Sequence, residues 1–237
     1  MNYIIHKADS RGTADHGWLS TFHTFSFADY YDPDRVHFGA LRVLNDDIIA
    51  GGTGFGHHPH NNMEIVTIIL EGEVKHTDSM GHEQVLREHE VQTMSAGTGI
   101  IHSEMNNLPD KPAKLLQIWV LPEKKNTSPR YSQKSFDPLK SKNRWQLLAG
   151  PAPVNEELEI RQRAWFQITE LDKNHQINYE MHDVGNGVYF FNISGKISLA
   201  GDLILENRDG AGVTETEKLN LEALENSKLL AIEIPMF

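Results

Sequence analysis

The sequence contains no cysteine among its 237 residues. This absence excludes disulfides, thiolate catalysis, iron–sulfur clusters and cysteine-type zinc sites. There is also no apolar run near the roughly 20 residues that a membrane-spanning helix needs, and residues 1–7 (MNYIIHK) lack the basic-then-apolar pattern of a signal peptide. We therefore expect a cytoplasmic protein with no membrane partner.

Basic residues are scarce as well. The chain has 22 Lys and Arg against 33 Asp and Glu, which gives a formal net charge of −11 at pH 7. A charge of this sign repels phosphate backbones, so direct nucleic-acid binding is not expected. The hydrophobic fraction of 39%, with 18 Gly and 10 Pro, is typical of a globular protein, and the length allows one large domain or two smaller ones.

Histidine, in contrast, is abundant and unevenly distributed. Of 13 histidines in the chain, eleven lie within the first 102 residues. Histidines that only make a surface polar are expected to be spread more evenly. The distribution indicates that the first half of the chain contains a site that uses imidazole.

Short apolar runs separated by turn residues dominate the chain and predict an all-β protein. Residues 65–70 and 73–76 flank a Glu-Gly pair and are typical of a hairpin. Residues 41–50 (LRVLNDDIIA) are interpreted as two strands joined by an Asn/Asp turn.

The same pattern divides the chain in two. Residues 123–144 are polar and form the best candidate linker, after which strand patterns resume. The hairpin around Gly72 resembles a second one around Gly195, which indicates a weak internal repeat. Residues 220–226 are the best helix candidate. These features predict two consecutive β domains.

Two short motifs carry metal-binding side chains at strand spacing. His58 and His60 are two residues apart, and so are His102 and Glu104, which follow the glycine-rich segment 97–99. Residues two apart on a strand point to the same face, so two such strands can present three imidazoles and one carboxylate to one ion. This donor set suits iron, manganese, cobalt, nickel, copper or zinc.

These motifs resemble the paired motifs of the cupin superfamily, and the resemblance is closer still to the pirins, which are two-barrel cupins. Residues 23–33 (HTFSFADYYDP), 58–60 (HPH) with Glu64, and 94–104 (MSAGTGIIHSE) carry it, and the match spans residues 10–135. One departure is that seven residues rather than six separate Glu64 from Gly72.

The resemblance implies an all-β bicupin fold of two consecutive cupin-type β-barrels with few short helices. Residues 1–135 are expected to form an N-terminal metal-binding barrel, and residues 136–237 a C-terminal barrel without metal ligands. The implied ligands are His58, His60, His102 and Glu104, with Glu64 as a hydrogen-bonding partner behind them. Four ligands around an ion that prefers six leave open positions, as in catalytic sites.

The implied function is a metal-dependent dioxygenase that opens the heterocycle of a flavonol such as quercetin (2,3-dioxygenase activity) and releases carbon monoxide. Fe(II) is the favoured ion, with Mn, Co, Ni, Cu or Zn as alternatives. Glu104 is assigned a catalytic role as general base toward the flavonol 3-hydroxyl. The alternative is a non-enzymatic metal-binding regulatory protein that modulates a transcription factor or a metabolic enzyme.

Other residues receive plainer interpretations. His57 lies on the opposite parity to the pair beside it and is assigned to a turn or a supporting role. His76, His82 and His89 flank a polar stretch and are expected to be solvated. His16, Trp18 and His23 fit either a lid over the barrel or ordinary packing, whereas Phe25, Phe27 and Trp119 are expected in the core. The sequence names no separate cofactor-binding residue.

Overall fold

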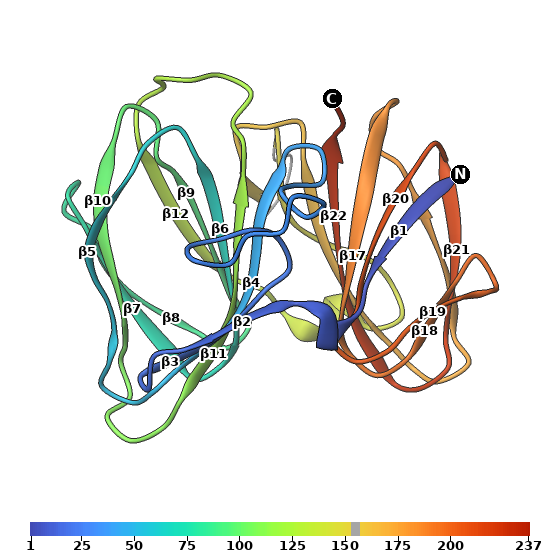
Figure 1. Ribbon diagram of the computed structural model, residues 1–237, viewed down its shortest axis with the longest axis horizontal. Helices are drawn as coiled ribbons and strands as arrows, with labels where there is room; N and C mark the ends of the chain where they lie inside the picture. The colour runs from blue at the N-terminus through green and yellow to red at the C-terminus, as the bar shows by residue number, and fades with distance from the viewer. Residues whose placement is uncertain (153–156) are drawn as a thin grey trace.

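Two β-barrels lie side by side in the computed structural model, which describes residues 1–152 and 157–237 (Figure 1). Strands dominate the described residues, and the helical segments among them are two short 3₁₀ helices, η1 (Ala8–Ser10) and η2 (Pro138–Ser141). No helix in this part of the chain has the length and apolar character to cross a membrane. The expected fold of two cupin-type barrels is confirmed.

The N-terminal barrel consists of a seven-stranded and a four-stranded sheet. The larger sheet contains, in spatial order, β12 (Arg130–Ser135), β9 (Glu90–Ser95), β6 (Glu64–Glu71), β11 (Ala113–Val120), β4 (Leu41–Ile49), β3 (Leu19–His23) and β2 (Gly12–Asp15). The smaller sheet contains β5 (Gly54–His60), β10 (Ile100–Asn106), β7 (Glu73–Asp78) and β8 (Glu83–Arg87).

The C-terminal barrel has the same arrangement. Its larger sheet contains β1 (Asn2–His6), β20 (Gly210–Thr214), β17 (Asn186–Ser194), β22 (Ser227–Pro235), β15 (Trp165–Leu171), β13 (Gln146–Gly150) and β14 (Leu158–Glu159). Its smaller sheet contains β16 (Gln176–Glu180), β21 (Lys218–Ala223), β18 (Ile197–Leu199) and β19 (Leu203–Leu205). The N-terminal strand β1 pairs with β20 and therefore joins this barrel.

The strand orders of the two barrels match one to one, which agrees with the repeat seen in the sequence. The chain turns from β6 into β7 at Gly72, whose φ is 80°, and from β17 into β18 at Gly195, whose φ is 84°. Only glycine takes such a conformation readily. In both places the chain crosses from the larger sheet to the smaller one, so the expectation that residues 65–70 and 73–76 form a hairpin is wrong. The strands that correspond to β5 and β10 are β16 and β21, and neither contains a histidine.

An apolar cluster joins the two larger sheets. It includes Leu41, Leu44 and Val66 from the N-terminal barrel and Phe166 and Tyr189 from the C-terminal barrel. A second cluster fills the C-terminal barrel, whereas the interior of the N-terminal barrel has two smaller ones. The division of the chain at residues 135 and 136 stays a prediction.

Three further expectations about local structure are wrong. The helix expected at residues 220–226 is absent, because residues 220–223 belong to strand β21. Leu219, Leu221 and Ala223 of this strand are buried, as alternate residues of a strand are when one face packs inward. The expected linker contains strand β12, which pairs with β9. Residues 41–49 form one continuous strand, because the polar side chains in its middle are hydrogen-bonded inside the protein and do not turn the chain.

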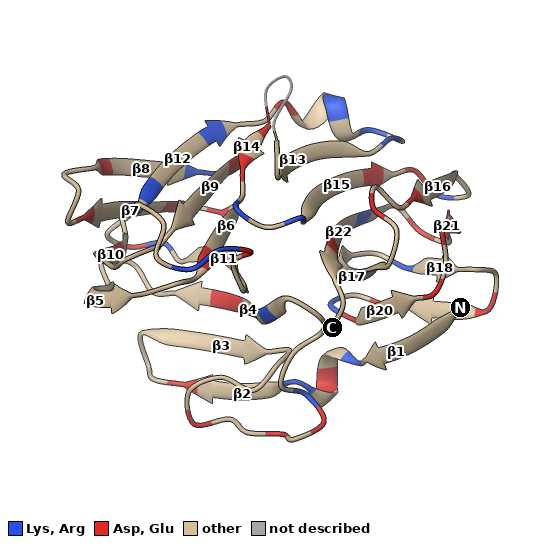
Figure 2. Cartoon of the chain, turned by 90° about the horizontal axis from the view of Figure 1, so that it is seen from above, with Lys and Arg blue, Asp and Glu red and all other residues tan. Residues whose placement is uncertain are grey.

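Charges of both signs are distributed over both barrels and their loops (Figure 2). Many acidic groups are paired, as in the buried contact between Arg11 Nη1 and Asp46 Oδ2 at 3.3 Å. The negative net charge is therefore spread over the molecule.

Candidate metal centre

His58 and His60 lie on strand β5 and point to the same side of it, as residues two apart on a strand do. Their ring centroids are 4.9 Å apart. Pro59 lies between them and is exposed on the other side. His57 is exposed as well, so it lies outside the cluster.

His102 approaches this pair from the neighbouring strand. It is directly opposite His58 in the pairing of β10 with β5, and the two ring centroids are 4.4 Å apart. The nitrogen atoms that the three histidines offer all lie within 4.8 Å of one another. The Nε2 atom of His102 is buried and has no hydrogen-bond partner in the described structure. A buried nitrogen without a partner is costly in a folded protein, and a metal ion would satisfy it.

Hydrogen bonding and burial keep these imidazoles in the form that binds metals. His58 Nδ1 donates to the carbonyl oxygen of Gly56 at 2.8 Å, which leaves the lone pair on Nε2. Burial, together with the neighbouring His58, lowers the pKa of His60 to about 4. Burial and the neighbouring His58, His60 and His76 lower the pKa of His102 to about 2. Both rings are therefore neutral at physiological pH.

Glu104 lies two residues after His102, is 3% exposed, and contacts polar side chains from the larger sheet. Its carboxylate accepts hydrogen bonds from Gln117 Nε2 at 2.7 Å, Gln92 Nε2 at 3.3 Å and Thr67 Oγ1 at 3.4 Å. Burial raises the pKa of Glu104, although these bonds and the nearby histidines oppose the shift. The donors are cross-strand neighbours, since Gln117 pairs with Thr67 and Thr67 pairs with Gln92.

The structure thus brings together three of the four predicted ligands, and Glu104 joins them through His102. Glu104 forms a second potential metal-binding group with His102 and His76, again with ligand atoms within 4.8 Å of one another. Its assignment as the fourth ligand remains a proposal. The residues present fit a divalent ion with nitrogen and oxygen ligands.

His76 is the residue that sequence reasoning missed. It was expected in solvent, but it is 0% exposed on strand β7. Its Nδ1 lies 3.4 Å from His102 Nδ1, its Nε2 lies 3.1 Å from Asp78 Oδ2, and its ring stacks on Tyr131. The alternation of Val74, His76 and Asp78 on the inner face of one strand is the signal that could have located it.

Asp78 continues this chain of contacts toward the surface. It accepts a hydrogen bond from His82 Nδ1 at 2.9 Å, and the His82 side chain is 39% exposed. Although burial opposes the shift, hydrogen bonds from His76 and His82 lower the pKa of Asp78. Asp78 is therefore a carboxylate at neutral pH.

A cavity of about 600 Å³ opens beside the histidines, between the two sheets of the N-terminal barrel. Its lining includes His58, His60 and Glu104 and the aromatic side chains of Trp18, Phe27, Tyr30, Phe55 and Trp119. His16 and His23 line it too, and His23 does so from strand β3 in the barrel wall, so the lid stays a prediction. Phe27 and Trp119 were expected in the core but face the cavity, whereas Phe25 is buried between the barrels.

Glu64 does not support the histidines. Its carboxylate accepts hydrogen bonds from Ser95 Oγ at 2.8 Å and from the backbone N–H of Arg161 at 3.0 Å. Strand β6 directs this side chain toward the segment that enters the C-terminal barrel. The expected role of Glu64 behind the ligands is wrong because its hydrogen bonds go elsewhere.

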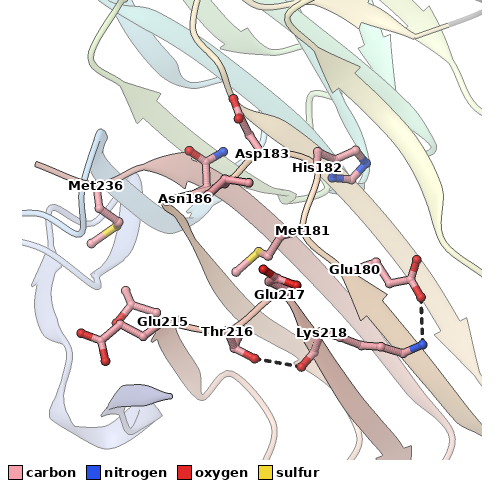
Figure 3. A pocket seen from close by; sticks show the side chains of 13 residues that line it. Glu180, Met181, His182, Asp183, Asn186, Glu215, Thr216, Glu217, Lys218 and Met236 are labelled. Atoms are coloured by element: carbon pink, nitrogen blue, oxygen red, sulfur yellow. Dashed lines mark hydrogen bonds and ion pairs between the residues drawn. The ribbon is translucent and has the colours of Figure 1, made fainter.

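A second, more open pocket of about 1120 Å³ lies in the C-terminal barrel (Figure 3). Its lining is mostly acidic and polar, and Glu180 forms an ion pair with Lys218 at its edge. It contains one histidine, His182, whose Nδ1 donates to the buried Glu233 at 2.8 Å. The His182 side chain therefore fixes its own segment to strand β22 through Glu233.

Comparison with protein families gives two matches that together cover most of the chain. The family described as Pirin matches residues 5–120, and the family described as Quercetinase C-terminal cupin domain matches residues 147–234. A protein named quercetin 2,3-dioxygenase from Escherichia coli strain K12 is 40% identical over 235 residues, which cover 98% of each chain. A pirin-like protein from Caulobacter vibrioides is 37% identical and covers 95% of this chain and 96% of its own.

Solved structures agree. YhhW from Escherichia coli superposes with a TM-score of 0.95 at 38% identity, covering 100% of this chain and 99% of its own. A structure described as bacterial pirin YhhW in complex with nickel(II) has a TM-score of 0.94 at 37% identity and covers both chains fully.

Proposed function

Because this chain belongs to the pirin family, we propose that it is a metal-dependent dioxygenase that opens the heterocycle of a flavonol such as quercetin. Relatives at about 40% identity bear the name quercetin 2,3-dioxygenase, and a structure similar to this one holds nickel(II). The observation that carries the proposal is the convergence of three imidazoles beside an aromatic-lined cavity, two of which, those of His58 and His60, line it.

In this proposal His58, His60 and His102 hold one divalent ion and Glu104 completes the set. Fe(II) is the favoured ion, and nickel(II) is the ion that a relative's structure contains. When bound, the ion supplies Lewis-acid polarisation of the flavonol oxygen atoms. The reaction consumes one dioxygen per flavonol and releases carbon monoxide.

Glu104 is the proposed general base. Burial favours its proton-bearing form, so this carboxylate is a better proton acceptor than one in water. The hydrogen bond from Gln117 at 2.7 Å fixes one carboxylate oxygen, so the group is held in place for the flavonol 3-hydroxyl proton. The aromatic side chains around the cavity hold the flat rings and exclude water.

Oxygen uptake with quercetin, measured alongside the metal content of the protein, tests this function. We expect the metal-loaded protein to consume oxygen and release carbon monoxide in equal amounts. His58→Ala and His102→Ala are expected to lose both metal and turnover, and Glu104→Gln to lose turnover. Full oxygen consumption by a metal-free His58→Ala protein would overturn the proposal.

A further inference from the structure

A row of polar side chains crosses the inner face of the larger sheet in the N-terminal barrel. Successive cross-strand pairs join His23 to Asn45, Asn45 to Gln117, Gln117 to Thr67 and Thr67 to Gln92. The half that contains Gln117, Thr67 and Gln92 holds Glu104. The other half has no such role in the metal centre.

This other half, His23 and Asn45, forms a compact group with the next cross-strand pair of β3 and β4 that faces the same side. Thr21 pairs across the strands with Asp47, beside the pair of His23 and Asn45. We call these four residues the β3–β4 cluster. All four line the cavity, and they are between 2% and 4% exposed.

Hydrogen bonds inside the cluster leave part of its capacity unused. Thr21 Oγ1 donates to Asp47 Oδ1 at 2.5 Å, and His23 Nδ1 donates to the amide oxygen of Asn45 at 2.9 Å. Within the described residues, no hydrogen bond engages the other Asp47 oxygen, His23 Nε2 or the Asn45 amide nitrogen. The cluster therefore offers acceptors at Asp47 and His23 and a donor at Asn45.

Polar groups in a barrel interior cost stability unless they are satisfied. In the C-terminal barrel, the positions that correspond to Gln117, Thr67 and Gln92 hold Ala231, Phe190 and Ala211. The position that corresponds to Asn45 holds Gln167, whose Nε2 lies 3.3 Å from His182 Nε2 within the same barrel. The β3–β4 cluster occurs in the barrel that contains the histidines and the aromatic-lined cavity. A polar group of this kind, facing a cavity with several aromatic side chains in its wall, is typical of a ligand-binding site.

We propose that the β3–β4 cluster binds the hydroxyl groups of a second aromatic ring of the substrate, the ring that is not bound at the histidines. A phenolic hydroxyl donates one hydrogen bond and accepts others, so two adjacent hydroxyls match the acceptors at Asp47 and His23 and the donor at Asn45. Trp18 and Phe55, whose rings meet edge to face at 5.1 Å, supply part of the apolar wall.

This inference rests on the proposed function in its choice of ligand, because it assigns the pendant hydroxylated ring of a flavonol to the cluster. Quercetin has two adjacent hydroxyls on that ring, whereas galangin has the same fused rings and none. A difference in affinity between the two compounds therefore reports the contribution of the β3–β4 cluster, because their fused rings present the same groups to the histidines.

Dissociation constants of both compounds, measured anaerobically on the metal-loaded protein, test the proposal without turnover. We expect the wild type to bind quercetin at least about tenfold more tightly than galangin, because a site built to hydrogen-bond a hydroxyl discriminates against its absence. Asp47→Ala is expected to reduce this ratio to within about threefold and to change galangin binding little. Asn45→Ala is measured in the same way and replaces Asp47→Ala as the test variant if Asp47→Ala does not fold. Asp34→Asn, an exposed acid outside the cavity lining, is the control and keeps the wild-type ratio.

Equal affinities of the wild type for the two compounds, an unchanged ratio in a folded Asp47→Ala protein, or no quercetin binding would each overturn the proposal. The outcomes also separate it from the proposed function. If the ratio of the galangin and quercetin dissociation constants depends on Asp47 but no flavonol is turned over, the cluster binds hydroxylated rings and the dioxygenase proposal fails. If quercetin is turned over but the ratio is one, the dioxygenase proposal stands and this inference fails.

Discussion

The Nδ1 atoms of His76 and His102 lie 3.4 Å apart inside the N-terminal barrel. Asp78 is a carboxylate and can only accept, so the His76 Nε2 atom that faces it carries the proton. The lone pair of His76 Nδ1 then faces His102, and His102 Nδ1 donates to it. This leaves the lone pair of His102 on Nε2, the buried atom without a partner. His76 therefore sets the tautomer that a metal ion needs.

Removing this contact is expected to weaken metal binding. His76→Phe preserves the stacking on Tyr131 but removes both hydrogen bonds, and we expect nickel(II) affinity to fall by about 10–100-fold. His76→Gln, which can still accept from His102, should lose less. Isothermal titration with a competing chelator measures both constants, and His89→Gln, at an exposed position, is the control. If His76→Phe binds nickel as tightly as the wild type, His76 does not position His102.

Metal loading is expected to stabilise the fold. At a free nickel(II) concentration of about 100 times Kd, binding to the folded state adds about 2.7 kcal/mol, which corresponds to a rise in Tm of roughly 5–10 °C for a domain of this size. Chelation should reverse the rise. The shift should disappear in His58→Ala and His102→Ala, so an equal shift in these variants would show that nickel binds elsewhere.

Much of the metal centre was predictable because strand geometry is simple. His58 and His60, and likewise His102 and Glu104, are two residues apart, and a period of two directs such pairs to one face whatever the fold. The sequence could not show how far the Glu104 carboxylate extends toward the other histidines. That depends on Gln117 and Gln92, which lie on the opposite sheet.

The residues that the sequence misplaced are polar side chains inside the barrel. Asn45 and Asp47 resemble a turn because turns and polar cavity walls use the same residue types, and only pairing with β3 and β11 distinguishes them. His76 was misplaced for the same reason, since its neighbours along the chain are polar. In both cases long-range contacts determine burial, and local composition does not reveal them.

The fold is expected to lose stability in acid through His6, whose ring meets that of Phe25 from the N-terminal barrel edge to face at a centroid distance of 5.7 Å. Burial lowers the pKa of His6 to about 4, and its Nδ1 lies 2.8 Å from the hydroxyl of Tyr189. The unfolded chain, with a histidine pKa near 6.5, binds the proton first, so stability present above that pH is lost as pH falls toward 4. The loss amounts to roughly 3 kcal/mol at most. Urea unfolding of His6→Gln and wild type at pH 7 and pH 4.5 should show a smaller acid loss in the variant, and parallel losses would contradict this assignment.

Asp47 is expected to destabilise the fold in the opposite pH range. Burial raises its pKa from 3.8 to about 7, with nearby Asp46 and Glu104 adding to the shift and the hydrogen bond from Thr21 opposing it. The unfolded chain releases this proton first, so the folded state loses stability as pH rises from about 4 to 7, by as much as about 4 kcal/mol.

Asp47→Asn removes the ionisation and leaves an oxygen that can accept from Thr21. Its unfolding free energy should therefore exceed that of the wild type at pH 7.5 and approach it at pH 4. Urea denaturation at the two pH values measures the difference, with Asp34→Asn as the exposed control. A difference that does not change with pH would show that ionisation of Asp47 is not its source. A gain at neutral pH would mean that the chain retains a destabilising carboxyl in its cavity, as is typical of residues kept for binding.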